Sequence, residues 1–268
     1  WSHVDLPIGH ASSGEAFYGL SFPEGQSGCQ SEPLVDCYAW VAGTSGTILR
    51  SPDGGLTWPA PMVTGTTNQL NSIHFTPGGN GWAVGNNGIV LYSTDYGVSW
   101  NQLLLPDAGV GNLHAVYAID EQRVFTVTEY GQVWQSTQGG QSIDPKQGGW
   151  ELIYTVPQSL YGLSGSNDNN PRVWTVGTNG LFQQVFGPDE PPPTQQTSGF
   201  SATFQDVAVV SNEIGWIVGD DGVLLNKTEF GVTWDDERDE LEHADGNDPH
   251  DLHGIDFVGT DLAWIVGE

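Results

Sequence analysis

The stretch GWAVGNNGIVLYSTDYGVSW, residues 81–100, is the unit from which the rest of the chain is built. It reads as a short apolar strand, a hairpin turn at residues 85–88, a second apolar strand and an aspartate-containing turn that ends at Trp100. Asn and Gly tolerate the positive φ that a tight hairpin turn requires. One hairpin cannot bury its own apolar surface, so the stretch needs copies of itself to pack against.

Copies of this stretch recur along the whole chain. The segments that begin at Trp40 and Trp216 repeat it, and in all three copies the two tryptophans are 18 residues apart. With three weaker copies included, the anchors lie at residues 40, 82, 125, 174, 216 and 264, which are 42 to 49 residues apart. A four-stranded propeller blade needs roughly 40 to 50 residues, so this period is typical of a β-propeller.

Each anchor is preceded by a short apolar run, and each aspartate turn is followed by another, which makes four strands per repeat. The sequence therefore predicts an all-β fold: a β-propeller of four-stranded antiparallel blades, as a single domain over residues 1–268. Six repeats are visible, and a seventh is expected if the chain is a fragment of a longer protein. A β-solenoid is the alternative, although its repeats are usually shorter.

The charge is strongly negative, with 33 acidic residues against 6 basic ones and a net charge of −27. This balance argues against a nucleic acid or an anionic membrane surface as the partner. No apolar run reaches the roughly 18 residues of a membrane span, so no membrane insertion is expected. A halophilic protein would have this composition because salt screens the repulsion. A secreted protein in calcium-rich water, or an acidic surface unrelated to any partner, would share it.

Two features bear on covalent and metal chemistry. Cys29 and Cys37 enclose a loop of seven residues, and a disulfide between them would indicate a secreted or periplasmic setting; two free thiols are the alternative. The segment between Asp235 and Asp251 is rich in carboxylates, which suit calcium. It lacks a recognisable calcium-loop spacing, so a solvated acidic loop explains it as well. No other cofactor or metal site is expected.

The turn Ser-x-Asp-x-Gly-x-Thr/Ser-Trp at 51–58 and 93–100 resembles the aspartate box of bacterial neuraminidase repeats. Joined to the preceding Trp-x-Val-Gly strand, the unit is similar to the photosystem II stability/assembly factor family of β-propellers. This resemblance covers essentially the whole chain and implies the fold more strongly than the function. The turn residues have structural reasons to be there: carboxylates accept N–H groups of their own turn, glycines suit a left-handed backbone, and tryptophans pack beneath the hairpin. These residues are Asp53, Gly55, Trp58, Asp95, Gly97 and Trp100.

Catalytic chemistry is not expected. A sialidase needs a cluster of arginines, a tyrosine nucleophile and an acid, but the four arginines here avoid the first strands and share no repeat position. The resemblance to assembly factors implies docking on a client through a basic patch. Six basic residues cannot build such a patch, which argues against a photosystem client.

One set of residues stands out as a binding site when the first strands of the repeats are aligned. Their second position is polar or amphipathic in every repeat. First strands line the central channel of a propeller, so these side chains would form a ring at its mouth that suits a ligand or a peptide. The alternative is that they only solvate a water-filled channel. The six residues are Tyr18, Asn71, His114, Tyr161, Gln205 and His253.

These observations predict a non-enzymatic interaction or structural module that binds a protein or a glycan. We expect it to be secreted, outside the cell or on a cell or virion surface, as part of an appendage, a surface layer or a virion. A sialidase-like glycan-processing enzyme and a periplasmic or lumenal assembly factor are the alternatives. The oligomeric state is left open.

Overall fold

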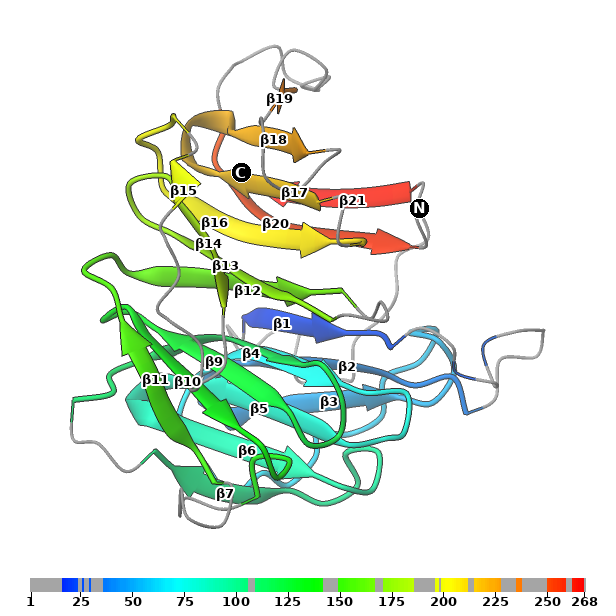
Figure 1. Cartoon of the computed structure of the whole chain (residues 1–268). Coiled ribbons are helices and arrows are strands. Elements are labelled where there is room, and N and C mark those ends of the chain that lie inside the picture. The colour runs from blue at the N-terminus through cyan, green and yellow to red at the C-terminus, as the bar shows by residue number, and fades with distance from the viewer. Residues whose placement is uncertain are drawn as a thin grey trace. The chain divides into compact units, whose positions relative to one another are not determined.

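The structure, a computed structural model, forms two compact units (Figure 1). Unit 1 comprises residues 1–126 and 135–151, and unit 2 comprises residues 127–134 and 152–268. The residues that the structure describes are 16–23, 26, 29, 36–105, 109–141, 149–166, 171–185, 196–197, 199–211, 215–227, 235–237, 250–258 and 262–267.

The first three sheets follow one another along the chain, and their strands lie in sequence order. The first sheet has three strands, β1 (Phe17–Ser21), β2 (Ala39–Gly43) and β3 (Ile48–Ser51). The second has four strands, β4 (Leu70–Phe75), β5 (Gly81–Gly85), β6 (Ile89–Ser93) and β7 (Asn101–Leu104). The third also has four strands, β8 (Leu113–Ala118), β9 (Val124–Thr128), β10 (Gln132–Ser136) and β11 (Glu151–Thr155).

The remaining sheets belong to unit 2. One contains β12 (Leu160–Gly165), β13 (Val173–Gly177), β14 (Leu181–Val185) and β15 (Gln196–Thr197). The next contains β16 (Phe204–Val209), β17 (Gly215–Gly219), β18 (Leu224–Lys227) and β19 (Asp235–Asp236). The last is a hairpin of β20 (Leu252–Val258) and β21 (Leu262–Gly267).

The sheets are propeller blades, as the sequence predicts, but their number differs from the prediction. The described residues form five blades of three or four strands and one two-stranded hairpin, rather than six or seven complete blades. The reason is that, within the described ranges, the sixth repeat contributes β20 and β21 alone. Within unit 1 the first strands β1, β4 and β8 pack against one another in turn, and within unit 2 β12, β16 and β20 do the same.

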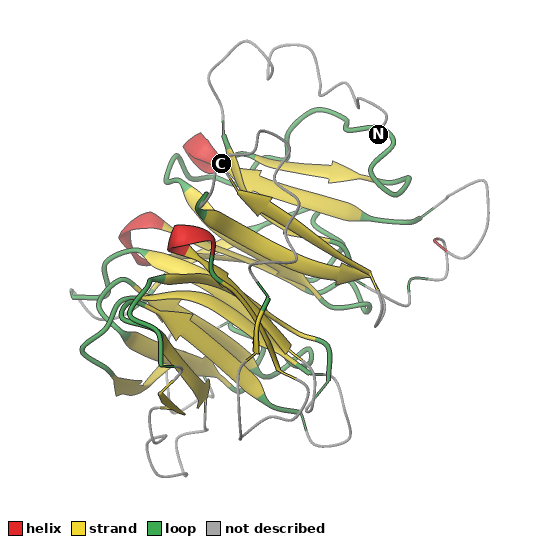
Figure 2. Ribbon diagram, turned by 90° about the horizontal axis from the view of Figure 1, so that it is seen from above, coloured by secondary structure: helices red, strands yellow, loops and turns green. Residues whose placement is uncertain are grey.

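Short 3-10 turns connect the second and third strands in three repeats, drawn in red in Figure 2. They are η2 (Thr44–Gly46), η3 (Asn86–Gly88) and η5 (Asp220–Gly222). The middle residue of each has a φ near +60°, for example 61° at Asn87, and Asn and Asp adopt that region more readily than most side chains. The polar and glycine-rich sequence between the apolar strands is therefore what closes these hairpins.

The core of each unit lies between neighbouring blades. All five residues of β5 and of β13 are buried, whereas the outer strand β7 is mostly exposed. Trp40 stacks on Phe75 of the next blade with ring centroids 3.7 Å apart. In unit 2 Trp174 stacks on Phe182 of its own blade at 4.7 Å, and both belong to a buried cluster that includes Phe204 of the next blade. Inner strands covered on both faces need continuous apolar runs instead of strict alternation, which explains sequences such as Trp-Ala-Val.

Candidate functional site

The second residue of the first strand is the bulged residue of its ladder. In the second blade Leu70 lies opposite Gly85 and Ser72 lies opposite Val84, so the register skips Asn71. The same shift occurs at the predicted site residues of four other repeats. These residues are Tyr18, Tyr161, Gln205 and His253. A β-bulge re-aims the side chain that it carries, and bulges are common beside binding sites.

In unit 1 the predicted site residues stand on successive first strands and outside the core. Tyr18 is 53% exposed, and Asn71 and His114 are half-buried. The Asn71 Nδ2 atom donates to Asn86 Oδ1 at 3.0 Å and to the Leu113 carbonyl at 2.8 Å. Asn71 thus ties its strand both to the turn η3 of its own blade and to the first strand of the next blade.

Unit 2 repeats the pattern. Gln205 Nε2 donates to Asp220 Oδ1 in the turn η5 at 2.7 Å, which corresponds to the bond between Asn71 and Asn86. Tyr161 is half-buried and His253 is exposed. The structure therefore groups three of the predicted residues in each unit, while the ring of all six stays a prediction.

The aspartate turns are held together by their own side chains. Asp53 Oδ1 accepts the Thr57 N–H at 2.8 Å, Asp53 Oδ2 accepts the Thr57 hydroxyl at 2.6 Å, and Ser51 Oγ accepts the Gly55 N–H at 2.8 Å. The hydrogen bond from the Thr57 hydroxyl is the main cause that holds the pKa of Asp53 below its ordinary value. These contacts are local to the turn and assign the carboxylate a structural role.

The second aspartate turn has the same bonds. Asp95 accepts the Ser99 N–H at 2.9 Å and the Ser99 hydroxyl at 2.6 Å, while Ser93 Oγ accepts the Gly97 N–H at 2.9 Å. Burial acts to raise the pKa of Asp95, but the hydrogen bonds from Ser99 and Ser93 outweigh it and lower the pKa. The left-handed φ of Gly97, 74°, and of Gly55, 89°, is the conformation expected of glycine in these turns.

The turns also bind the preceding blade, a contact that the sequence analysis missed. The indole N–H of Trp40 donates to the Tyr96 carbonyl at 3.2 Å, and that of Trp82 donates to the Gly139 carbonyl at 2.7 Å. The residue after each carbonyl is a glycine because a Cβ on Gly97 would lie 2.7 Å from the Trp40 Nε1 atom. The even spacing of the tryptophans was the available signal, but spacing does not reveal a partner in another repeat.

The tryptophans that end the turns are less buried than these anchors. Trp58 and Trp100 are half-buried. Trp100 meets Phe75 edge-on, with ring centroids 5.7 Å apart and planes at 85°. It therefore packs beside the Trp40–Phe75 stack at the blade interface.

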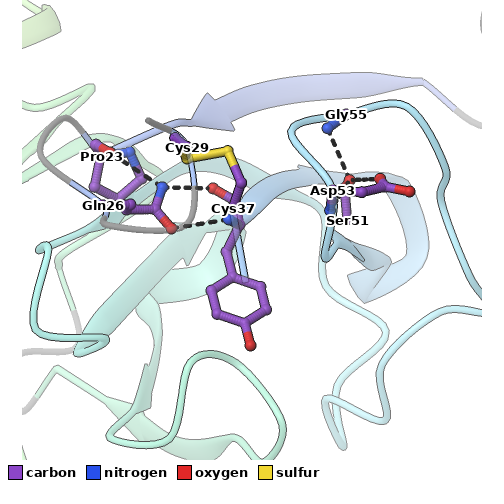
Figure 3. The surroundings of a disulfide bond; sticks show 8 residues. Pro23, Gln26, Cys29, Cys37, Ser51, Asp53 and Gly55 are labelled. Carbon is purple, nitrogen blue, oxygen red and sulfur yellow. Dashed lines mark hydrogen bonds between the residues drawn. A yellow bond between two sulfur atoms is a disulfide. The ribbon is translucent and has the colours of Figure 1, made fainter. Parts of the chain in front are cut away.

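A disulfide joins Cys29 to Cys37 and fastens the insertion between β1 and β2 onto the first aspartate turn (Figure 3). The backbone of Cys37 forms an isolated β-bridge with that of Asp53, and the Cys37 N–H donates to the Pro52 carbonyl at 3.2 Å. The Gln26 amide closes the loop further, because its Nε2 donates to the Tyr38 carbonyl and its Oε1 accepts the Tyr38 N–H, both at 2.8 Å. The disulfide is thus part of the packing of the first blade.

The proposed calcium segment lies mostly outside the described residues. Of the stretch between Asp235 and Asp251, only residues 235–237, 250 and 251 are described. Across the described ranges no three His, Cys, Asp or Glu side chains gather in a way that could hold a metal ion. In the same ranges no helix has the length and apolar character needed to cross a membrane.

Arg50 and Arg123, two of the arginines in the described part of the chain, each contact a nearby side chain. Arg123 makes a 2.8 Å ion pair with Asp120, three residues away. Arg50 lies over the Tyr38 ring, 4.2 Å from its centroid. Two of the four arginines are therefore engaged by neighbours in their own repeats.

Antiparallel blades of three or four strands that recur along the chain define a β-propeller. Residues 34–149 match the family model described as Photosynthesis system II assembly factor YCF48. The photosystem II assembly protein Ycf48 of Synechococcus sp. strain JA-3-3Ab is 26% identical over 308 residues, covering 100% of this chain and 86% of the relative. The predicted resemblance to photosystem II assembly factors is confirmed.

Two solved structures share the fold. YCF48 bound to a D1 peptide is 22% identical with a TM-score of 0.52, covering 99% of this chain and 93% of that one. YCF48 from Cyanidioschyzon merolae is 16% identical with the same TM-score, covering 100% and 96%. At this level of identity the likeness concerns the fold.

The comparisons correct one prediction. An extracellular or virion-surface location is wrong, because the matched family model and the relative from Synechococcus are photosystem II assembly proteins. The expectation was based on the acidic charge and the cysteine pair. Net charge describes solubility and association, and a disulfide reports an oxidising environment, so neither identifies a location outside the cell.

Proposed function

We propose that this protein is a non-enzymatic assembly factor of the Ycf48 type that holds an extended segment of a protein client. The observation that carries the proposal is the bulged side chain that recurs on the first strands within each unit. It is joined by a similarity to photosystem II assembly proteins that covers the whole chain. This replaces a surface-displayed module as the main interpretation.

The chemistry of the predicted site residues suits a peptide. Tyr18 and Tyr161 offer flat amphipathic rings, and His114 and His253 offer directional hydrogen bonds. In two repeats the bulged amide is oriented by the adjacent turn, through the bonds to Asn86 and Asp220. Side chains that are already oriented lose less freedom when a ligand binds, which favours recognition of a polypeptide over loose contact.

The net charge of the protein indicates which client segments it can bind. With 33 acidic and 6 basic residues the protein repels acidic segments and attracts basic ones. We therefore propose a neutral or basic client segment, and binding that weakens as salt rises. The client of the solved relative, a D1 peptide, is the first one to test.

Fluorescence anisotropy with labelled overlapping peptides of D1 tests the proposal directly. We expect one or a few peptides to bind, and Tyr161→Ala and His114→Ala to weaken that binding at least tenfold, about 1.4 kcal/mol. Leu104→Ala is the control, because Leu104 is 58% exposed on the outer strand β7, away from the first strands. Absence of binding by every peptide would reject a D1 client. If both site variants bind as tightly as the unmodified protein, the predicted residues are rejected as the site.

These observations do not support a sialidase-like activity. Such a site needs several arginines close together. Among the described residues Arg50 instead contacts Tyr38, and Arg123 instead pairs with Asp120. The relatives, moreover, are named for assembly. Turnover of any sialoside by the purified protein would overturn this part of the proposal.

A further inference from the structure

Side-chain oxygens on one first strand bind backbone N–H groups of the next. In unit 1 Ser21 Oγ accepts the Phe75 N–H at 2.9 Å, and Ser72 Oγ accepts the Val116 N–H at 3.2 Å. In unit 2 Ser164 Oγ accepts the Val209 N–H at 3.1 Å. Neighbouring blades are thus linked by short neutral side chains on their first strands.

Asp206 makes the corresponding link between the fifth repeat and the hairpin of β20 and β21. Its Oδ2 atom accepts the Ile255 N–H at 3.1 Å, and its Oδ1 atom accepts the N–H of Val207 at 2.9 Å. Asp206 occupies the third position of its first strand, where Ser72 stands in the second repeat. The other repeats have Gly19, Ala115, Gly162 and Gly254 at this position, so Asp206 is the one ionisable residue of the series.

Asp206 is half-buried among the strands packed against β16. The backbone of Asp206 is close to Gly162 of β12, so close that a Cβ on that glycine would lie 2.8 Å from the Asp206 Cα atom. The strands packed against β16 are β12, β13, β17 and β20. Their titratable side chains are Tyr161 on β12 and His253 and Asp256 on β20, while β13 and β17 bring none.

We propose that Asp206 makes the attachment of the β20–β21 hairpin to the fifth repeat depend on pH, so that the hairpin is held most tightly under acidic conditions and less tightly as the pH rises toward neutral. This is a property of the blade interface in unit 2 and does not rest on the proposed binding of a client. It requires only that the carboxyl group loses its protein surroundings when the hairpin detaches.

The sign follows from linkage. Burial raises the pKa of Asp206 to about 7, the negative charge of Asp256 adds to the rise, and the N–H groups of Ile255 and Val207 oppose it. With the hairpin detached, the carboxyl group is solvated and its pKa returns toward the ordinary value of about 4. Attachment therefore takes up a proton, so its contribution is complete below about pH 4, is progressively lost as the pH rises from about 4 to about 7, and changes little above that. Between pH 5 and pH 8 full solvation would raise the opening equilibrium about a hundredfold.

Native-state hydrogen exchange tests this on the unmodified protein. The readout is the protection factor of the Ile255 amide, corrected for intrinsic exchange at each pH. The Val209 amide is the control, because it donates to a neutral serine at the equivalent interface of the same unit. We expect Ile255 to lose at least tenfold in protection between pH 5 and pH 8 relative to Val209. A constant ratio would overturn the proposal.

A matched variant and a direct titration complete the test. Asp206→Ser copies the serine of the second repeat, which accepts the equivalent N–H, and should leave the Ile255 protection factor independent of pH. If the variant keeps the pH dependence, another group is responsible and the proposal fails. Carboxyl ¹³C NMR of the unmodified protein gives the answer without any substitution: a midpoint for Asp206 near 4 in place of about 7 would also reject the mechanism.

Discussion

Trp82→Phe measures what the indole bond between neighbouring blades contributes. Trp82 is 1% exposed, and its Nε1 atom donates to the Gly139 carbonyl at 2.7 Å. Phe retains an aromatic ring in the same place but removes the N–H, so the buried carbonyl loses this donor. Leaving one buried acceptor without its partner costs about 1–3 kcal/mol. Trp82→Ala removes the packing as well and should cost about 3–5 kcal/mol.

The assay is urea unfolding followed by far-ultraviolet circular dichroism, with the midpoint and the slope fitted for each variant. Trp58→Phe is the control, because it makes the same change at a half-buried position and should cost less than half as much. Gly140→Ala perturbs the bond from the other side. A Cβ there would lie 3.0 Å from the Trp82 Nε1 atom, on a residue with a φ of 66°. A Trp82→Phe protein within about 0.5 kcal/mol of the unmodified protein would refute a role for this bond.

Three further outcomes follow from the structure. Asp95→Ala should lower the free energy of unfolding by about 1–3 kcal/mol, because the bonds from Ser99 and Ser93 are lost, and an unchanged urea midpoint would contradict this. Burial lowers the pKa of His74 to about 4, so stability should be complete above pH 6.5 and decline as the pH falls toward 4; His74→Gln should flatten that decline in a series of melting curves. With a net charge of −27, the melting temperature should rise from low salt to molar potassium chloride, and a flat or falling curve would remove the inference of a halophilic protein.

The strands were largely predictable because their signals are local. The apolar run expected before the anchor Trp82 is β4 (Leu70–Phe75), and the predicted turn at 85–88 contains η3 (Asn86–Gly88). Apolar runs of five or six residues between Gly, Asn and Asp specify short strands and tight turns within one repeat. The recurrence of those signals then indicated blades, because a single hairpin could not cover itself.

The sequence could select candidate site residues but not their geometry. Aligning the first strands selected Asn71 and Gln205 by their polarity, yet nothing in the alignment showed that they are bulged or that Asn86 and Asp220 orient them. A bulge depends on the register against the second strand, and a shift of one residue reverses every side chain. The register is settled by pairing, which the sequence of one strand does not contain.

The repeat period, the turn chemistry and the negative charge could all be obtained from the order of residues, since each depends on neighbours a few positions apart or on simple counts. The contacts between blades could not. The bond from Trp82 to Gly139 joins residues 57 positions apart, and that from Ile255 to Asp206 joins residues 49 apart. Such pairs meet only when whole blades have formed and packed. For that reason the indole bonds, the number of complete blades and the burial that raises the pKa of Asp206 belong to the tertiary structure.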